Sequence, residues 1–457
     1  MLDPKGFLLV ECQNVEQILQ ESLRYRYSED VAAKYYTECF ARLGSIVNGI
    51  KSVPMDEPDL LQDWREQLGT LSVLITHIER SHLEEFPWPF AFELERVAHD
   101  ICAHYARTKD VLFFFMADGS PISYAVRGDE FLTVRRSKIY SVFFPRTLKD
   151  YVLLHAIFGH EVGHVISLAA GASEKKGSEI SDVEMDLFAD SRFATIDGFY
   201  EWCRANIGVL SKASDSYLKE NLKSWRREIF SDLFGLLMMG PSFLYAFQSL
   251  LAPMYAPDQK LAFVPRHPPY PLRMVILHQA AEYLKMFYGD EGGDAAKLFR
   301  KLDKEFRATA KPFLNSEFAV VRDDKIHAAV SSLQKLMEKY DKPSVLYQRP
   351  ENALLSELIK SLKKHIPPVG PKQINGDGSL QPLQLVDFRS IIHAGWITWA
   401  QRSADNKNDD LDDVSENVSE SERFRTLNRF CAHAIMQQGG IRRLLDYQLK
   451  EERKNNQ

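Results

Sequence analysis

The stretch from Val152 to Leu168 constrains this chain most, because it is apolar on nearly every side and yet contains two histidines and a glutamate. A helix that is apolar all round is typical of a domain core. On such a helix His160 and His164 share one face, one turn apart. Glu161 lies about 100° round the helix from His160. The segment therefore places the pattern His-Glu-x-x-His inside the protein.

Two imidazoles one helical turn apart can bind one zinc ion, and a glutamate beside them can take a proton from a metal-activated water. The plainer alternative is a buried helix that happens to carry two histidines. That alternative needs a hydrogen-bond partner for each buried polar side chain, because unpaired ones are destabilising. We therefore expect His160 and His164 to bind Zn²⁺ and Glu161 to act as the general base.

Charge and cysteine content exclude several classes of protein. The 457-residue chain has a net charge of −6 and a pI near 6.1, which argues against a nucleic-acid partner bound by broad phosphate neutralisation. Its five cysteines include no Cys-x-x-Cys pair, which favours reduced thiols and a cytoplasmic protein. The first residues show no basic and apolar pattern of a secretion signal.

One apolar run, from Leu233 to Leu251, is about as long as a membrane span. Gly240 and Pro241 interrupt it in the middle, and polar residues stand at both ends. Because proline breaks a helix, we expect two buried core helices with a kink, and no membrane-spanning segment.

Hydrophobic periodicity predicts an α+β protein that is mainly α-helical, in three regions. Residues 1–108 form an N-terminal helical region. Residues 109–345 combine a small sheet with further helices. Residues 346–457 form a C-terminal helical region, with a solvated acidic loop at 403–422.

Four short β-branched and aromatic segments precede the histidine helix, and some are separated by Gly-Asp or Asp-Gly turns. They predict a small, mostly antiparallel sheet, after which the helix begins beyond Arg146. An edge strand next to a metal can pair with an extended peptide, and we assign this role to the last segment. The four segments are 111–116, 122–126, 131–134 and 138–144.

A catalytic zinc site needs a third protein ligand, and two acidic pairs are candidates. Glu228 and Asp232 share a helical face at the start of the apolar run, where a carboxylate is rarely left unpaired. Asp186 and Asp190 are also four residues apart and lie closer in sequence to the histidines. Glutamate crosses the gap between packed helices more easily than aspartate. We therefore predict Glu228 as the ligand and Asp232 as the partner of a ligating histidine's outer N–H.

A proline-rich segment, 266–274, would hold His267 and Arg273 in a fixed geometry. A donor or cation next to the open metal position could stabilise the oxyanion of a tetrahedral intermediate. We therefore count both residues as auxiliary catalytic candidates.

The order His-Glu-x-x-His, Glu-x-x-x-Asp, His-Pro-x-x-x-x-Arg resembles that of gluzincin metallopeptidases, in particular the CAAX prenyl endopeptidases and bacterial heat-shock membrane proteases. This resemblance covers residues 138–275, in motifs only. It implies a zincin-like catalytic core in which both histidines and Glu228 bind zinc and Glu161 activates water. It further implies that Asp232 supports the site and that His267 and Arg273 lie close to it.

Three departures from that family are visible. Ser231 stands where the family usually has alanine before the aspartate. The family usually has several transmembrane helices, and we expect none here. The helical regions at both ends match no known pattern.

We therefore expect a zinc metallopeptidase that cleaves a peptide or protein substrate. The alternative is a zinc-containing interaction or sensing protein without protease activity, in which a fourth protein ligand closes the site. The sequence leaves the substrate and the oligomeric state open.

Overall fold

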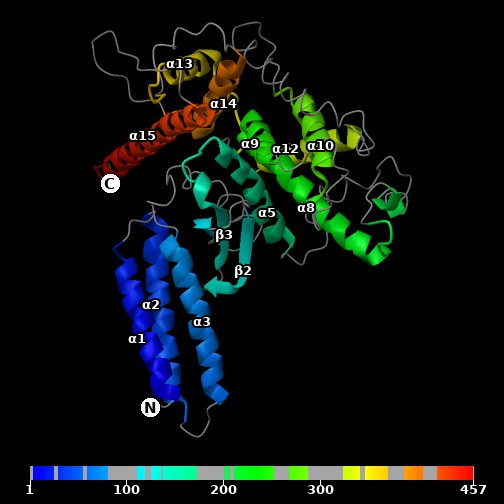
Figure 1. Ribbon diagram of the computed structural model, residues 1–457. Coiled ribbons are helices and arrows are strands. Elements are labelled where there is room, and N and C mark those ends of the chain that lie inside the picture. Colours follow the sequence, from blue (N-terminus) through cyan, green and yellow to red (C-terminus); the bar gives the residue numbers. More distant parts are fainter. Residues whose placement is uncertain are drawn as a thin grey trace. The chain divides into compact units, whose positions relative to one another are not determined.

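In the residues that it describes, the computed structural model contains helices and a three-stranded sheet (Figure 1). The described residues are 4–24, 29–54, 59–80, 111–118, 125–134, 137–171, 200–201, 203–205, 210–251, 267–286, 323–339, 345–368, 385–404 and 419–455. Most of them are helical, as predicted. The chain divides into two compact units, residues 1–149 and 150–457. The three regions expected from the sequence stay a prediction.

The described part of the first unit includes the helices α1 (Pro4–Ser22), α2 (Glu29–Ser52) and α3 (Asp59–Arg80), which pack against one another. Each buries one apolar stripe at helical spacing, exemplified by Leu19, Ile46 and Leu71, which are fully buried. Phe143 of the sheet joins the same apolar core. The sheet therefore belongs to the N-terminal unit.

The sheet has the order β1-β3-β2, and its strands are β1 (Val111–Asp118), β2 (Ala125–Val134) and β3 (Ser137–Pro145). Strand β3 is antiparallel to β2 but parallel to β1, so the predicted mostly antiparallel sheet is wrong in one of its two pairings. Only β2 and β3 follow each other as a hairpin, and β3 then lies between β2 and β1. The segments 122–126 and 131–134 do not form two strands, because the chain from Ala125 to Val134 is one strand with a register shift beyond Asp129.

This order also corrects the predicted role of residues 138–144. They belong to β3, which is the central strand and pairs on both sides, so it offers no free edge to a peptide. A strand's backbone groups are available to a partner only at the edge of a sheet.

The second unit begins after Lys149 and is helical where it is described. The histidine helix α5 (Phe158–Gly171) starts later than expected, after the short 3₁₀ turns η1 (Arg146–Leu148) and η2 (Leu154–Ile157). We attribute this later start of α5 to Leu153, because the backbone groups of Leu153 bond to side chains. Its N–H donates to Asn428 Oδ1 (2.9 Å) and its carbonyl accepts from Trp396 Nε1 (3.1 Å).

The other α-helices that the structure describes in this unit are α8 (Asp215–Met239), α9 (Pro241–Leu251), α10 (Tyr270–Tyr283), α12 (Asp323–Lys339), α13 (Asn352–Lys363), α14 (Phe388–Ala404) and α15 (Glu420–Asn455). Helix α14 packs against α9, α13 and α15 (Figure 1). The acidic loop predicted at 403–422 lies mostly outside the described residues, which stop at Ala404 and resume at Ser419.

Helix α8 is partly exposed in its first half and fully buried in its second half. The Ser214 hydroxyl accepts from the Tyr217 N–H and caps its first turn, and from Glu228 to Met239 every residue is buried. Gly240 then adopts φ +63°, which favours glycine, and its Cα faces the Tyr347 ring so closely that a side chain would not fit. The predicted kink between two buried helices is confirmed.

Within the described residues no helix combines the length and apolarity needed to cross a membrane.

Among the described helices, α5 and α8 make the most extensive contact, and small residues allow it. A Cβ built on Gly163 would lie 2.7 Å from Ser231 Cα, and one on Gly159 would lie 2.9 Å from Gly235 Cα. The two backbones therefore approach more closely than larger side chains would permit. This crossing brings the histidine face of α5 against the start of the buried half of α8.

We expect Gly163→Ala to lower the free energy of unfolding by roughly 1–3 kcal/mol, because the added methyl forces the two helices apart. Gly440→Ala in α15 is the matched control, since a Cβ there meets no atom within 4 Å. It should stabilise the protein by roughly 0.5–1 kcal/mol, since alanine favours helix. Denaturant unfolding of both variants measures the difference. An unchanged midpoint in Gly163→Ala would contradict the close crossing.

Candidate metal centre

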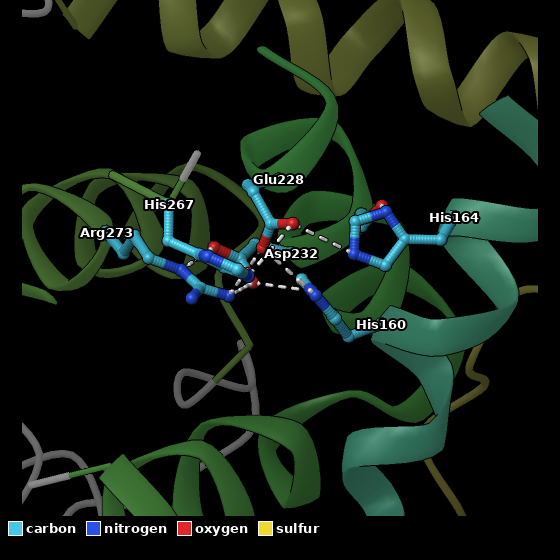
Figure 2. Close-up of polar contacts among 7 residues, drawn as sticks. His160, His164, Glu228, Asp232, His267 and Arg273 are labelled. Atoms are coloured by element: carbon cyan, nitrogen blue, oxygen red, sulfur yellow. Dashed lines mark hydrogen bonds and ion pairs between the residues drawn. The ribbon is translucent and has the colours of Figure 1, made fainter. Parts of the chain in front are cut away.

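Three donor residues predicted from the sequence lie together between α5 and α8 (Figure 2). One ligand atom each of His160, His164 and Glu228 lies within 4.8 Å of the others, so the three could hold one metal ion. Glu228 Oε2 lies 3.4 Å from His160 Nε2, and Glu228 Oε1 lies 3.2 Å from His164 Nε2. The same Nε2 edge of both rings thus faces the carboxylate.

The burial of Glu228 fits a cation at this point. Its Oε2 atom is buried, and no group among the described residues makes a hydrogen bond to it. His160 Nε2 at 3.4 Å and Arg273 Nη2 at 3.8 Å approach this oxygen without making a hydrogen bond to it, and a metal ion would satisfy it more fully. The donor set of two imidazoles and one carboxylate is also one that zinc prefers.

Electrostatics at the group favour positive charge. Burial alone raises the pKa of Glu228, but the adjacent His160 and His164 hold it well below its usual range. Burial alone lowers the pKa of His160, but Asp232 and Glu228 raise it to about 10. A proton on His160 thus takes up part of the role that a cation would have here. Metal binding would displace that proton, because a ligating imidazole must be neutral on the atom that binds.

Asp232 contacts His160 at the opposite ring edge, where the sequence placed a partner for the outer nitrogen of a ligating histidine. Its Oδ1 lies 2.8 Å from His160 Nδ1, and Arg273 contacts both of its oxygens, with Nη2 at 2.6 Å and Nε at 2.7 Å. Burial raises the pKa of Asp232, but Arg273 and His160 together hold it below its usual value. The Arg273 guanidinium lies 4.8 Å from the Phe247 ring centroid, which restricts it further. A bidentate pair of this kind fixes both partners.

Glu161 is buried on α5, next to His160 in the chain, and is not one of the three grouped donors. Among the described residues it takes part in no ion pair or side-chain hydrogen bond, in contrast to Glu228 and Asp232. Its carboxylate is therefore not committed to another of the described side chains.

The His267 ring points toward Glu228 (Figure 2). The His267 side chain is 48% exposed, against 8% for His160, and its Nε2 lies 3.5 Å from Glu228 Oε1. Pro268 and Pro269 follow His267 in the chain, are buried and lead into α10, whose first turn carries Arg273. The proline-rich segment thus presents the two auxiliary residues differently, with His267 accessible and Arg273 buried.

The competing acidic pair, Asp186 and Asp190, lies outside the described residues. Within the described part of the chain the group contains Glu228 as its carboxylate. The geometry thus supports the predicted ligand.

Sequence reasoning missed the contribution of Ser231, which it treated only as a departure from a family pattern. The Ser231 hydroxyl lies 3.1 Å from His164 Nδ1, the ring edge opposite Glu228. It also missed the glycines of the crossing. The spacing of Gly159 and Gly163, repeated by Ser231 and Gly235, is a signal from which close helix packing could have been predicted.

Comparison of the chain with family models, curated proteins and solved structures finds no match. The resemblance to gluzincin peptidases therefore depends on the three short motifs, and it stays a prediction.

Proposed function

We propose that this protein is a zinc-dependent peptidase with a zincin-like catalytic core made by α5 and α8. The observation that carries the proposal is the buried group of His160, His164 and Glu228. Glu161, the buried residue that follows His160 in the chain, pairs with no other described side chain. Three protein ligands leave a tetrahedral ion one position for water or substrate.

In this proposal each residue of the site has a separate role. His160, His164 and Glu228 hold the ion, which when bound supplies a Lewis acid that polarises a carbonyl and acidifies water. Glu161 takes the proton of the attacking water on its carboxylate and passes it to the nitrogen of the leaving amine. A carboxylate already paired with a cation would be a poor proton acceptor, so the absence of a described partner suits Glu161 to this role.

His267 and Arg273 would act in different ways. Half-exposed His267 can donate to the substrate carbonyl oxygen as negative charge develops there. Arg273 is committed to Asp232, and we assign it a positioning role that acts through His160. Both assignments refine the auxiliary roles expected from the sequence.

The alternative, a zinc protein without hydrolytic activity, would be expected to close its site with four protein ligands. The group that the described residues form has three donor residues. Buried Glu161, next to His160 in the chain, is a carboxylate that a purely structural zinc site would not require. Both features favour hydrolysis. We also infer a reducing compartment such as the cytoplasm, because the four described cysteines are buried and none of them is in a disulfide.

The test is metal-dependent cleavage of a peptide library. We expect the zinc-loaded protein to cleave a subset of peptides, the chelator-treated protein to cleave none, and added zinc to restore the same cleavage sites. Mass spectrometry of the products identifies each cleaved bond. A zinc-loaded protein that leaves peptides and unfolded proteins intact would overturn the proposal and favour the interaction or sensing role.

A further inference from the structure

Position 231 on α8 can hold only a small residue. A Cβ built on Gly163 of α5 would lie 2.7 Å from Ser231 Cα and 3.1 Å from its Cβ, so the two helices touch at this point. Ser231 is fully buried there. Among glycine, alanine and serine, which all fit such a crossing, only serine brings a polar group.

That polar group meets the outer edge of a metal-ligand candidate. Ser231 Oγ lies 3.1 Å from His164 Nδ1, while the Nε2 of the same ring lies 3.2 Å from Glu228 Oε1. A neutral imidazole carries its proton on one nitrogen only. If Nδ1–H donates to the serine oxygen, Nε2 keeps its lone pair on the side of the metal group.

The neighbouring residue serves the other histidine in the same way. Asp232 lies 2.8 Å from His160 Nδ1, so two consecutive residues of α8 contact the outer nitrogens of both rings. Asp232 is charged and held by Arg273, whereas Ser231 is neutral. A charged partner contributes more than a neutral one, so we expect the smaller effect at position 231.

We propose that Ser231 is a positioning residue of the metal site, which holds His164 in the tautomer and orientation that bind zinc through Nε2. The proposal rests on the metal group of the proposed function and is independent of hydrolysis. Partners of this kind typically change metal affinity by about 10- to 100-fold.

Ser231→Ala tests the proposal, because it removes one hydroxyl and adds no bulk at the crossing. We expect its zinc dissociation constant to rise about 10-fold in competition with a chromophoric chelator. We also expect the visible absorption spectrum of the cobalt-substituted protein to change, since that spectrum reports ligand geometry. Thermal unfolding of the metal-free variant should match that of the metal-free wild type.

Ser242→Ala in α9 is the matched control. Ser242 is a buried serine whose hydroxyl makes no hydrogen bond among the described residues, so zinc affinity and the cobalt spectrum should stay as in wild type. A purely structural Ser231 would lower metal-free stability and leave affinity and spectrum unchanged, which would overturn the proposal. An equal loss of zinc affinity in Ser231→Ala and Ser242→Ala would also overturn the proposal. A wild type that binds no zinc would overturn it as well. A wild type that binds zinc but cleaves nothing would overturn only the peptidase proposal.

Discussion

Replacing Glu161 by glutamine is expected to leave zinc bound and to lower the rate of peptide hydrolysis by about 100- to 10,000-fold. Glutamine has nearly the same shape, so the buried position next to His160 should accept it. It cannot accept the proton of the attacking water, and general base catalysis is lost. The measurement pairs metal content with turnover of a peptide that the wild type cleaves.

Glu220→Gln is the control for this variant. Glu220 is an exposed residue in the polar half of α8, so the change removes a carboxylate of the same kind far from the buried half. Activity and zinc content should both match the wild type. If Glu161→Gln loses zinc in proportion to activity, Glu161 is structural. If it retains full activity, the assigned base is wrong.

Replacing Glu228 by glutamine should remove zinc and activity together. The change deletes the carboxylate that faces both histidines, and its donor amide would point toward the ion in one orientation. We expect zinc affinity to fall by more than about 100-fold, beyond the effect typical of a supporting partner. Metal content after gel filtration, together with chelator competition, measures the loss.

Asp186→Asn separates Glu228 from the competing acidic pair. We expect this variant to keep zinc near the wild-type level, since the described residues already provide a carboxylate to the group. Retained zinc in Glu228→Gln, with loss in Asp186→Asn, would transfer the third ligand to the nearer pair. It would also remove the main argument for the gluzincin likeness.

Local sequence predicted the helical parts of the site well. His160 and His164 share a face because the turn of a helix is set by its backbone, whatever packs around it. The apolar run after Glu228 likewise predicted a buried helix, and Gly240 with Pro241 predicted its break. These properties depend on residues within a few positions of each other.

Strand pairing was harder to predict from the sequence than the helices, because it depends on contacts that sequence spacing does not specify. The segment 138–144 has the composition of a strand wherever it lies, and only the sheet shows that it is central and parallel to β1. Gly128 and Asp129 favour a turn in isolation, yet they lie within β2, beside a register shift that accommodates them.

The sequence by itself determined which residue types could bind a metal, the shared helical face of the two histidines and the acidic residues available to join them. Only the tertiary structure decided that Glu228 meets both rings, that Arg273 is committed to Asp232 and that Ser231 faces His164. The physical reason is the crossing of α5 and α8, where glycines allow two backbones to approach and so set which side chains come within reach.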